Sequence, residues 1–337
     1  MSTSTDLIQK IEKLESARLI SYVLADRLQG PQASIATDAL GLFHRHLEAI
    51  GEVKKIALFL YSTGGDTMVP WRLVNLIREY CSELIVLIPY KAHSAATLIC
   101  LGANEIIMGK MSELSPIDPS VANAFNPASP SAQGPSGQVP PQKIPISVED
   151  VAAYLRLATD RAGLNTPEGK LGAFQQLTSV VHPLALGNVE RSHTLIRELA
   201  KKLLGLHLDV SKERDREKVN EIIDILTEKL YSHQHLIPRK EAKDIIGLNI
   251  RYASKEIESL MMNLYEEYRT ELGIGEIINP TILLDNKTEL PINWPIAKIE
   301  TLATEDKFVL KGKIIRAQQA SQPPLVNIVE QGWIKVR

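Results

Sequence analysis

Three short apolar runs stand out in the first third of the chain, at residues 56–60, 84–88 and 105–108. Each run has the length of a β-strand, and the segments between them place hydrophobic residues at helical spacing. Strands that are joined by helical crossovers lie parallel in one sheet. The pattern therefore predicts an α/β fold, in which the carboxyl ends of these strands share the sheet edge where such folds carry their chemistry.

Helical periodicity continues through the middle of the chain and then gives way to a β-like pattern. Helices are predicted over residues 6–16, 35–50, 147–161, 184–204, 215–231 and 254–272, and a first strand over 19–24. From residue 277 on, short apolar runs are typical of strands. We therefore predict a large domain over residues 1–275 and a small β-rich C-terminal module over 276–337. Pro, Ser and Gly dominate residues 121–143, which predicts a mobile loop.

Small residues follow two neighbouring apolar runs of the predicted sheet. Gly64 and Gly65 come after the first run, and Ser94 and Ala95 open an apolar helix after the second. A serine in the first turn of a buried helix presents its hydroxyl at the sheet edge, and the amides of Gly65 and Ala95 can point at one oxyanion. This arrangement suggests nucleophilic acyl chemistry at Ser94. On local composition alone, a helix-capping serine beside a tight glycine turn is the favoured alternative.

Polar residues beside these turns are candidates for lining a substrate pocket. His93 precedes Ser94 directly, and we expect its side chain to diverge from that of the serine and to line the pocket. Asp66 and Lys91 are further pocket candidates, with plain surface placement as the alternative. His46 falls on the polar flank of a predicted helix, where a solvated side chain is expected.

Charge and composition exclude several classes of function. With 38 basic and 40 acidic residues the net charge is −2, so no electrostatic hold on nucleic acid or anionic lipid is expected. Cys81 and Cys100 lie in apolar contexts that the pattern predicts to be helical, which predicts free buried thiols and a reducing cytoplasm. No run approaches the ~20 apolar residues of a membrane helix. We expect a soluble cytoplasmic protein without membrane insertion.

Motifs for other kinds of chemistry are missing from the sequence. It contains no phosphate-binding G-x-x-x-x-G-K-[ST] loop, no zinc-binding H-E-x-x-H and no G-x-S-x-G elbow. We therefore expect no metal, no cofactor and no intrinsic ATPase. If unfolded proteins are substrates, a separate unfoldase or adaptor would have to deliver them.

The two small-residue turns resemble a known superfamily. S-T-G-G-D paired with H-S-A-A-T-L-I-C-L-G-A is similar to the serine peptidases of the Clp protease and crotonase superfamily. Together with S-P-I-D-P, H-P-L-A-L-G-N-V-E-R and L-Y-S-H-Q-H-L-I-P-R-K-E-A, the motifs most resemble the serine dehydrogenase proteinase family, relatives of signal peptide peptidase A. The resemblance covers roughly residues 19–248. It implies a superhelix of β-β-α units, peptide or protein substrates and a homo-oligomer.

On this resemblance Ser94 is the nucleophile of a serine peptidase, Gly65 and Ala95 form the oxyanion hole, and Gly64, Asp66 and His93 contact substrate. The general base is left open. Clp proteases carry a histidine on the strand and turn after the nucleophile, whereas this chain has S-E-L-S-P-I-D-P there.

Two residues are candidates for the base. Short signal peptide peptidases use a lysine further along the chain, and Lys143 is nearest that place. A lysine serves as a base only where desolvation or neighbouring cations lower its pKa. His182, before a proline and a helix start, is the rival. A solvated loop lysine and a helix-capping histidine are the respective alternatives.

Two other functions fit the same residues. A crotonase-like acyl-CoA enzyme would use the amide pair to stabilise an enolate, but it needs no serine at the head of the helix. A catalytically silent scaffold or adaptor would keep the fold without the base, and the missing histidine favours it. The serine peptidase is the hypothesis that accounts for most of the motifs.

Overall fold

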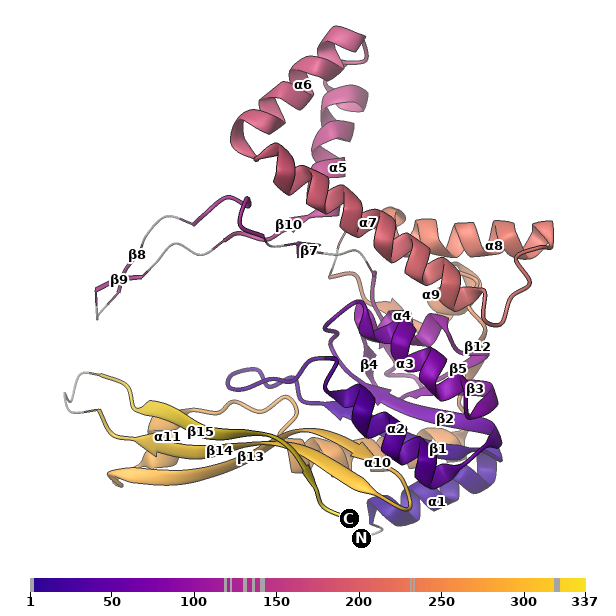
Figure 1. Ribbon diagram of the computed structural model, residues 1–337, viewed down its shortest axis with the longest axis vertical. Helices are drawn as coiled ribbons and strands as arrows, with labels where there is room; N and C mark the ends of the chain where they lie inside the picture. The colour runs from indigo at the N-terminus through magenta and orange to yellow at the C-terminus, as the bar shows by residue number, and fades with distance from the viewer. Residues whose placement is uncertain are drawn as a thin grey trace.

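The computed structural model describes residues 3–117, 120–121, 123–129, 132–134, 137–139, 143–230, 232, 234–317 and 322–337. Its centre is an eight-stranded sheet with the order β12-β5-β3-β2-β1-β13-β14-β15 (Figure 1). These strands are β1 (Arg18–Leu24), β2 (Val53–Tyr61), β3 (Cys81–Ile88), β5 (Glu105–Met108), β12 (Ile250–Tyr252), β13 (Glu289–Glu300), β14 (Glu305–Ile315) and β15 (Leu325–Lys335). The first five run parallel to one another, and the last three are antiparallel. The predicted α/β fold with a β-rich C-terminal part is confirmed.

Helices cover both faces of the parallel strands. They are α1 (Ser4–Glu15), α2 (Ala39–Ile50), α3 (Val69–Arg78), α4 (Ala95–Leu101) and α10 (Lys255–Leu272). Successive side chains of a strand point to opposite faces. On β2, Leu58 and Leu60 therefore lie in the core formed with α2, α3 and α4, whereas Phe59 and Tyr61 lie in the core formed with α1 and α10. Because both faces are buried, these strands are apolar at nearly every position.

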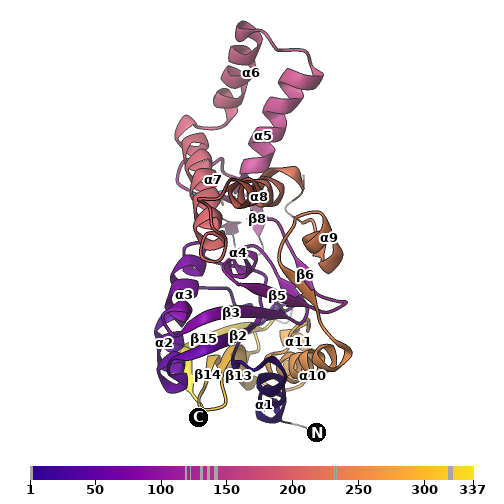
Figure 2. The same ribbon diagram turned by 90° about the vertical axis from the view of Figure 1, so that its right-hand side faces the viewer.

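A helical arm projects away from the sheet (Figures 1 and 2). The remaining helices are α5 (Val148–Arg156), α6 (Pro167–Val180), α7 (Pro183–Leu204), α8 (Glu213–Asp224), α9 (Arg239–Asp244) and α11 (Pro280–Leu284), with π-helical turns at Leu157–Arg161 and Ile225–Lys229. α5 and α6 form the outer end of the arm, and α7 leads back to the body. The sequence pattern does not predict α6, because only Ala173 of this helix is buried and it has no apolar stripe.

Short strands connect the body to the arm. β4 (Lys91–Ala92), β6 (Glu113–Leu114) and β11 (Ile237–Pro238) form a small sheet, β7 (Ser120–Val121) pairs with β10 (Ile146–Ser147), and β8 (Ala132–Gly134) pairs with β9 (Gly137–Val139). Part of the predicted loop over residues 121–143 and the Asp118 of S-P-I-D-P lie outside the described residues. The mobility of that loop stays a prediction.

Two of the sequence predictions are wrong. Cys81 is the first residue of β3 and not part of a helix, since α3 already ends at Arg78. His46 is fully buried, and its ring contacts Asp306 (2.9 Å) and Thr304 (2.7 Å). Burial lowers the pKa of His46 in spite of the nearby Asp306 carboxylate. The partner that makes this burial tolerable comes from β14, far away in the sequence.

The C-terminal strands continue the main sheet. β13 pairs with β1 from Ser21 opposite Glu300 to Leu24 opposite Ala297. Lys298, almost wholly buried, forms ion pairs with Glu300 (3.0 Å) on its own strand and with Glu305 (2.9 Å) at the start of β14. The predicted division into two domains at residue 276 stays a prediction.

Candidate active site

Ser94 occupies a strained turn between β4 and α4. Its backbone has φ 52° and ψ −114°, so it is a non-glycine residue with positive φ. Such conformations cost of order 1–3 kcal/mol and persist only where the surroundings enforce them. The residues of α4 that follow, from Ala95 to Leu101, are all buried. The sequence therefore places the predicted nucleophile on a rigid support and in a conformation that points to function.

Backbone hydrogen bonds fix this turn on both sides. The His93 amide donates to the Ser62 carbonyl (3.0 Å), which joins the turn to the end of β2. The Ala96 amide donates to the His93 carbonyl (2.9 Å) and the Leu98 amide to the Ser94 carbonyl (3.1 Å). The Ser94 amide donates to Ser115 Oγ (2.8 Å). The turn at residues 93–96, named the nucleophile turn after the predicted role of Ser94, is thus held from the preceding strand, from its own helix and from the segment after β6.

Gly64 brings the glycine turn against Ser94. A Cβ atom at Gly64 would lie 2.9 Å from Ser94 Cβ and 3.3 Å from Ser94 Oγ, and its φ is 117°. Both the contact and the conformation require glycine. The structure therefore brings together the two small-residue turns that the sequence analysis singled out.

Gly65 lies one residue further along and pairs with the segment before α2. The Ile35 amide donates to the Gly64 carbonyl (2.8 Å), and the Asp66 amide donates to the Ile35 carbonyl (2.8 Å). A Cβ atom at Gly65 would lie 2.2 Å from the Ile35 oxygen. These bonds leave out the amide of Gly65 itself, and the bonds of the nucleophile turn likewise leave out the Ala95 amide. An oxyanion hole made of these two amides stays a prediction.

The other predicted pocket residues have defined partners. Asp66 is exposed, and its carboxylate accepts from the Met68 amide (2.8 Å) just before α3. The His93 ring lies 3.1 Å from the Glu113 carboxylate of β6, and both side chains are largely buried. Burial raises the pKa of Glu113, and the Lys91 charge opposes this rise. A role for Asp66 and His93 in binding substrate stays a prediction.

Asp26 is a residue at this sheet edge that the sequence analysis missed. Its carboxylate accepts from Lys91 Nζ (2.8 Å) and from the Tyr61 hydroxyl (2.7 Å). Burial alone would lower the pKa of Lys91, but the bond and charge of Asp26 raise it above its ordinary value. Asp26 thus joins the ends of β2 and β4, which lead to Gly64 and Ser94. Its position just after a buried strand is the signal that could have found it.

The two candidate bases contact neighbouring residues of one segment, Asn126 and Phe125. Lys143 is exposed, and its Nζ donates to the Asn126 carbonyl (2.8 Å). His182 is also exposed and caps α7, with Nδ1 accepting from the Leu184 amide (3.1 Å) and its ring stacked on Phe125 at 4.9 Å between centroids.

Within the described part of the chain, the Ser94 hydroxyl forms no hydrogen bond, so neither candidate base is in contact with it. The identity of the base stays a prediction.

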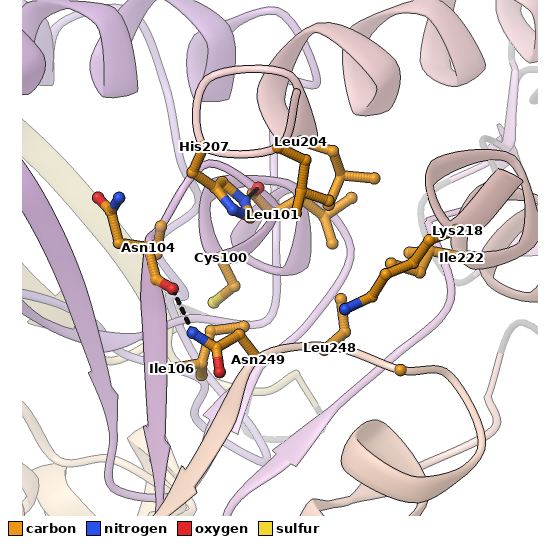
Figure 3. Close-up of a pocket in the computed structure, with 13 residues that line it drawn as sticks. Cys100, Leu101, Asn104, Ile106, Leu204, His207, Lys218, Ile222, Leu248 and Asn249 are labelled. Carbon is orange, nitrogen blue, oxygen red and sulfur yellow. Dashed lines mark hydrogen bonds between the residues drawn. The ribbon is translucent and has the colours of Figure 1, made fainter. Parts of the chain in front are cut away.

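A cavity of about 210 Å³ lies at the opposite end of α4 from Ser94 (Figure 3). His207 Nε2 donates to the Leu101 carbonyl (3.0 Å), and the Asn249 side chain donates to the Asn104 carbonyl (2.6 Å). Lys218 reaches across the cavity from α8. Cys100 is a free buried thiol, as predicted, and burial raises its pKa. The residues that line this cavity therefore fix the far end of α4, and the cavity is separate from the candidate site.

The described ranges also bear on metal binding and on membrane insertion. There, no cluster of three or more His, Cys, Asp or Glu side chains could hold a metal ion. Across the same residues, every helix is too short or too polar to cross a membrane.

Part of the chain matches a known family of proteins. Residues 39–134 match the sequence model of the ClpP-like SDH-type serine proteinases. The resemblance to the serine dehydrogenase-type proteinases is confirmed. The segment of this chain that matches the family model contains Gly64, Gly65 and Ser94, and it ends before Lys143 and His182.

Similar proteins have been identified by sequence and by structure. An uncharacterized protein of Methanocaldococcus jannaschii is 24% identical over 242 residues, 72% of this chain and 69% of its own length. A second uncharacterized protein of that organism is 31% identical over 77 residues, 23% of this chain and 26% of its own length. A mutant of the 1510-N membrane-bound stomatin-specific protease, solved with a substrate peptide, is 13% identical with a TM-score of 0.24, over 74% of this chain and 99% of that one.

Proposed function

We propose that this protein is a serine peptidase in which Ser94 attacks the carbonyl carbon of a peptide bond. One observation carries the proposal. Within the segment that matches the serine proteinase family, Ser94 heads a buried helix with φ 52°, and its side chain packs against Gly64. A helix-capping serine needs no such strain, since serine caps ordinarily adopt extended backbone. Among the described residues its side chain also forms no capping hydrogen bond.

The chemistry follows from the two turns. Attack by Ser94 Oγ places a negative charge on the substrate oxygen, and the amides of Gly65 and Ala95 stabilise that charge by donating to it. Gly64, Asp66 and His93 contact the substrate chain on either side. The leaving amine departs with the proton that the base took from Ser94, and water then releases the acyl group.

Lys143 is the first candidate for the base, and His182 is the second. Lys143 would have to exchange the Asn126 carbonyl for the Ser94 hydroxyl as its partner. Catalytic hydrogen bonds of this kind are often long or absent before substrate binds. We further propose a homo-oligomer in the cytoplasm that cleaves peptides without ATP and receives unfolded proteins from a separate unfoldase or adaptor.

A serine-reactive fluorophosphonate probe tests the proposal. The wild-type protein is expected to be labelled at Ser94, and Ser94→Ala to lose all labelling while keeping the wild-type melting temperature. Ser82→Ala, at an exposed serine of β3, is the matched control and should be labelled like the wild type. Labelling that survives in Ser94→Ala would refute the assignment of the nucleophile.

The silent scaffold remains the second candidate, because Lys143 and His182 are bonded to other groups and neither forms a hydrogen bond with the Ser94 hydroxyl. An absence of labelling between pH 6 and pH 10, with the fold intact, would favour it.

A further inference from the structure

Ser115 is the side chain that holds the backbone of the candidate nucleophile. It follows β6 and is 4% exposed. Its Oγ accepts the hydrogen bond from the Ser94 amide at 2.8 Å and donates to the Pro116 carbonyl at 3.0 Å. The single hydroxyl proton of Ser115 is therefore directed at Pro116. That leaves a lone pair of Oγ for the Ser94 amide.

Thr97 fixes Ser115 from the other side. Thr97 is fully buried, and its Oγ1 accepts from the Ser115 amide at 3.2 Å. The same hydroxyl lies 2.8 Å from the Ala92 carbonyl and 3.0 Å from the Ser115 carbonyl. Thr97 stands one turn after Ser94 on α4, and Ala92 stands just before the nucleophile turn. The network thus encloses Ser94 without touching its hydroxyl.

The bond to Ser115 lies where the backbone is least favourable. At φ 52° and ψ −114°, Ser94 is outside the helix, so its amide has no partner within α4. A partly buried amide that lost this partner would be only partly rehydrated. Relaxation of Ser94 to a negative φ would turn this amide away from Ser115 and redirect the side chain. The acceptor on Ser115 consequently favours the strained conformation over the relaxed one.

We propose that Ser115 is a positioning residue, which holds Ser94 in its strained conformation and thereby aims the Ser94 hydroxyl, and that Thr97 orients Ser115. The effect on reactivity rests on the proposed peptidase function. The effect on the backbone does not, because it concerns the Ser94 amide alone.

The chain offers a matched control for this test. Ser112, three residues earlier, is equally buried at 2% exposure. Its Oγ also accepts from a backbone amide, that of Gly109 at 2.7 Å, and donates to a backbone carbonyl, that of Ile88 at 2.5 Å. It does not contact Ser94. Ser112→Ala therefore reproduces the structural loss of Ser115→Ala without the loss at the nucleophile.

The first readout is hydrogen exchange of the Ser94 amide in the full chain, resolved by mass spectrometry with electron-transfer fragmentation. Ser115→Ala is expected to exchange at least ~10-fold faster than the wild type, whereas Ser112→Ala leaves the rate at Ser94 unchanged. Ser115→Cys keeps the volume and a weak acceptor, so its rate should fall between the two. Equal rates in Ser115→Ala and Ser112→Ala would overturn the proposal.

The second readout is the rate of fluorophosphonate labelling. A misdirected nucleophile should cost ~10- to 100-fold in Ser115→Ala, with part of the rate restored in Ser115→Thr and Ser115→Cys. The loss should appear in kcat and not in KM for a peptide substrate. A wild type that is never labelled defeats the proposed function, while hydrogen exchange still decides the positioning role. Labelling that stays at the wild-type rate in Ser115→Ala overturns that role.

Discussion

The nucleophile turn and the segment that carries the candidate bases are built in opposite ways. At the turn, Ser94 is fixed through its amide, its carbonyl and its contact with Gly64, and the atoms that hold it are buried. Lys143 and His182 are exposed and are each bonded to a nearby backbone group, the Asn126 carbonyl and the Leu184 amide. The family match has the same boundary, since it includes the turn and neither base.

The difference shows which part of the proposed site is preorganised. A nucleophile and an oxyanion hole must be in place before substrate arrives, because their contribution depends on donors that do not have to reorganise. The base, in contrast, can reach the nucleophile when substrate binds, provided that the segment carrying it is free to move. Four predictions test this division.

Gly65→Ala should disturb the largest part of the site, because the new methyl group would meet the Ile35 carbonyl oxygen at 2.2 Å. The turn would have to move away from Ser94, so fluorophosphonate labelling should fall by at least ~10²–10³-fold. Gly172→Ala on α6 has nothing within 4 Å and should leave labelling unchanged while stabilising the helix by ~0.5–1 kcal/mol. An active Gly65→Ala variant would show that the turn is not rigid.

Lys143→Met should lower the labelling rate by ~10²–10⁴-fold if Lys143 is the base. The melting temperature should barely change, because the side chain is exposed and has one described bond, to the Asn126 carbonyl. Lys170→Met, at an exposed lysine of α6, is the control. An unchanged rate in Lys143→Met would remove this lysine from the mechanism.

His182 can be separated into its two possible roles by a pair of variants. His182→Asn keeps an acceptor for the Leu184 amide, whereas His182→Ala loses the cap and should cost ~0.5–2 kcal/mol of stability. If His182 only caps α7, both variants keep the wild-type labelling rate, and urea unfolding shows a loss of stability in His182→Ala alone. A loss of labelling in both variants would make His182 the base.

Asp26→Asn should have the smallest effect on labelling, and it should cost ~1–3 kcal/mol of stability in a pH-dependent way. Because the folded-state pKa of Lys91 is raised, its pairing with Asp26 stabilises the protein fully below the unfolded value of ~10.4, and this contribution disappears as pH rises through the folded value. Urea unfolding at pH 8 and pH 11 should therefore show a smaller change with pH in Asp26→Asn than in the wild type. Equal changes of stability with pH in the two proteins would contradict a stabilising Asp26–Lys91 pair.

The fold was largely predictable because its strands are buried on both faces. The apolar runs at residues 56–60, 84–88 and 105–108 became β2, β3 and β5, and small residues marked the two turns at their carboxyl ends. The sequence could not show that β13 pairs with β1, since the apolar pattern of a strand does not specify which strand it pairs with. It also placed His46 in solvent, because the buried partner Asp306 comes from a distant strand.

The site was predictable only as far as residue type restricts geometry. Gly64 and Gly65 stand where a Cβ atom would clash, so their pattern is informative. Ser115 is one serine among many, and its bond to the Ser94 amide depends on the turn after β6. The base is harder still, because its approach to Ser94 depends on the conformation of a long Pro-rich segment rather than on a local motif.

The pairing of β13 with β1 has a consequence for synthesis of the protein on the ribosome. β1 is made well before the strand that covers its free edge, which lies some 280 residues downstream, as the Ser21–Glu300 pair shows. Contacts of such high sequence separation form slowly, and unpaired strand edges favour aggregation meanwhile. The nascent chain therefore carries an open, apolar sheet edge at β1 until β13 has been made.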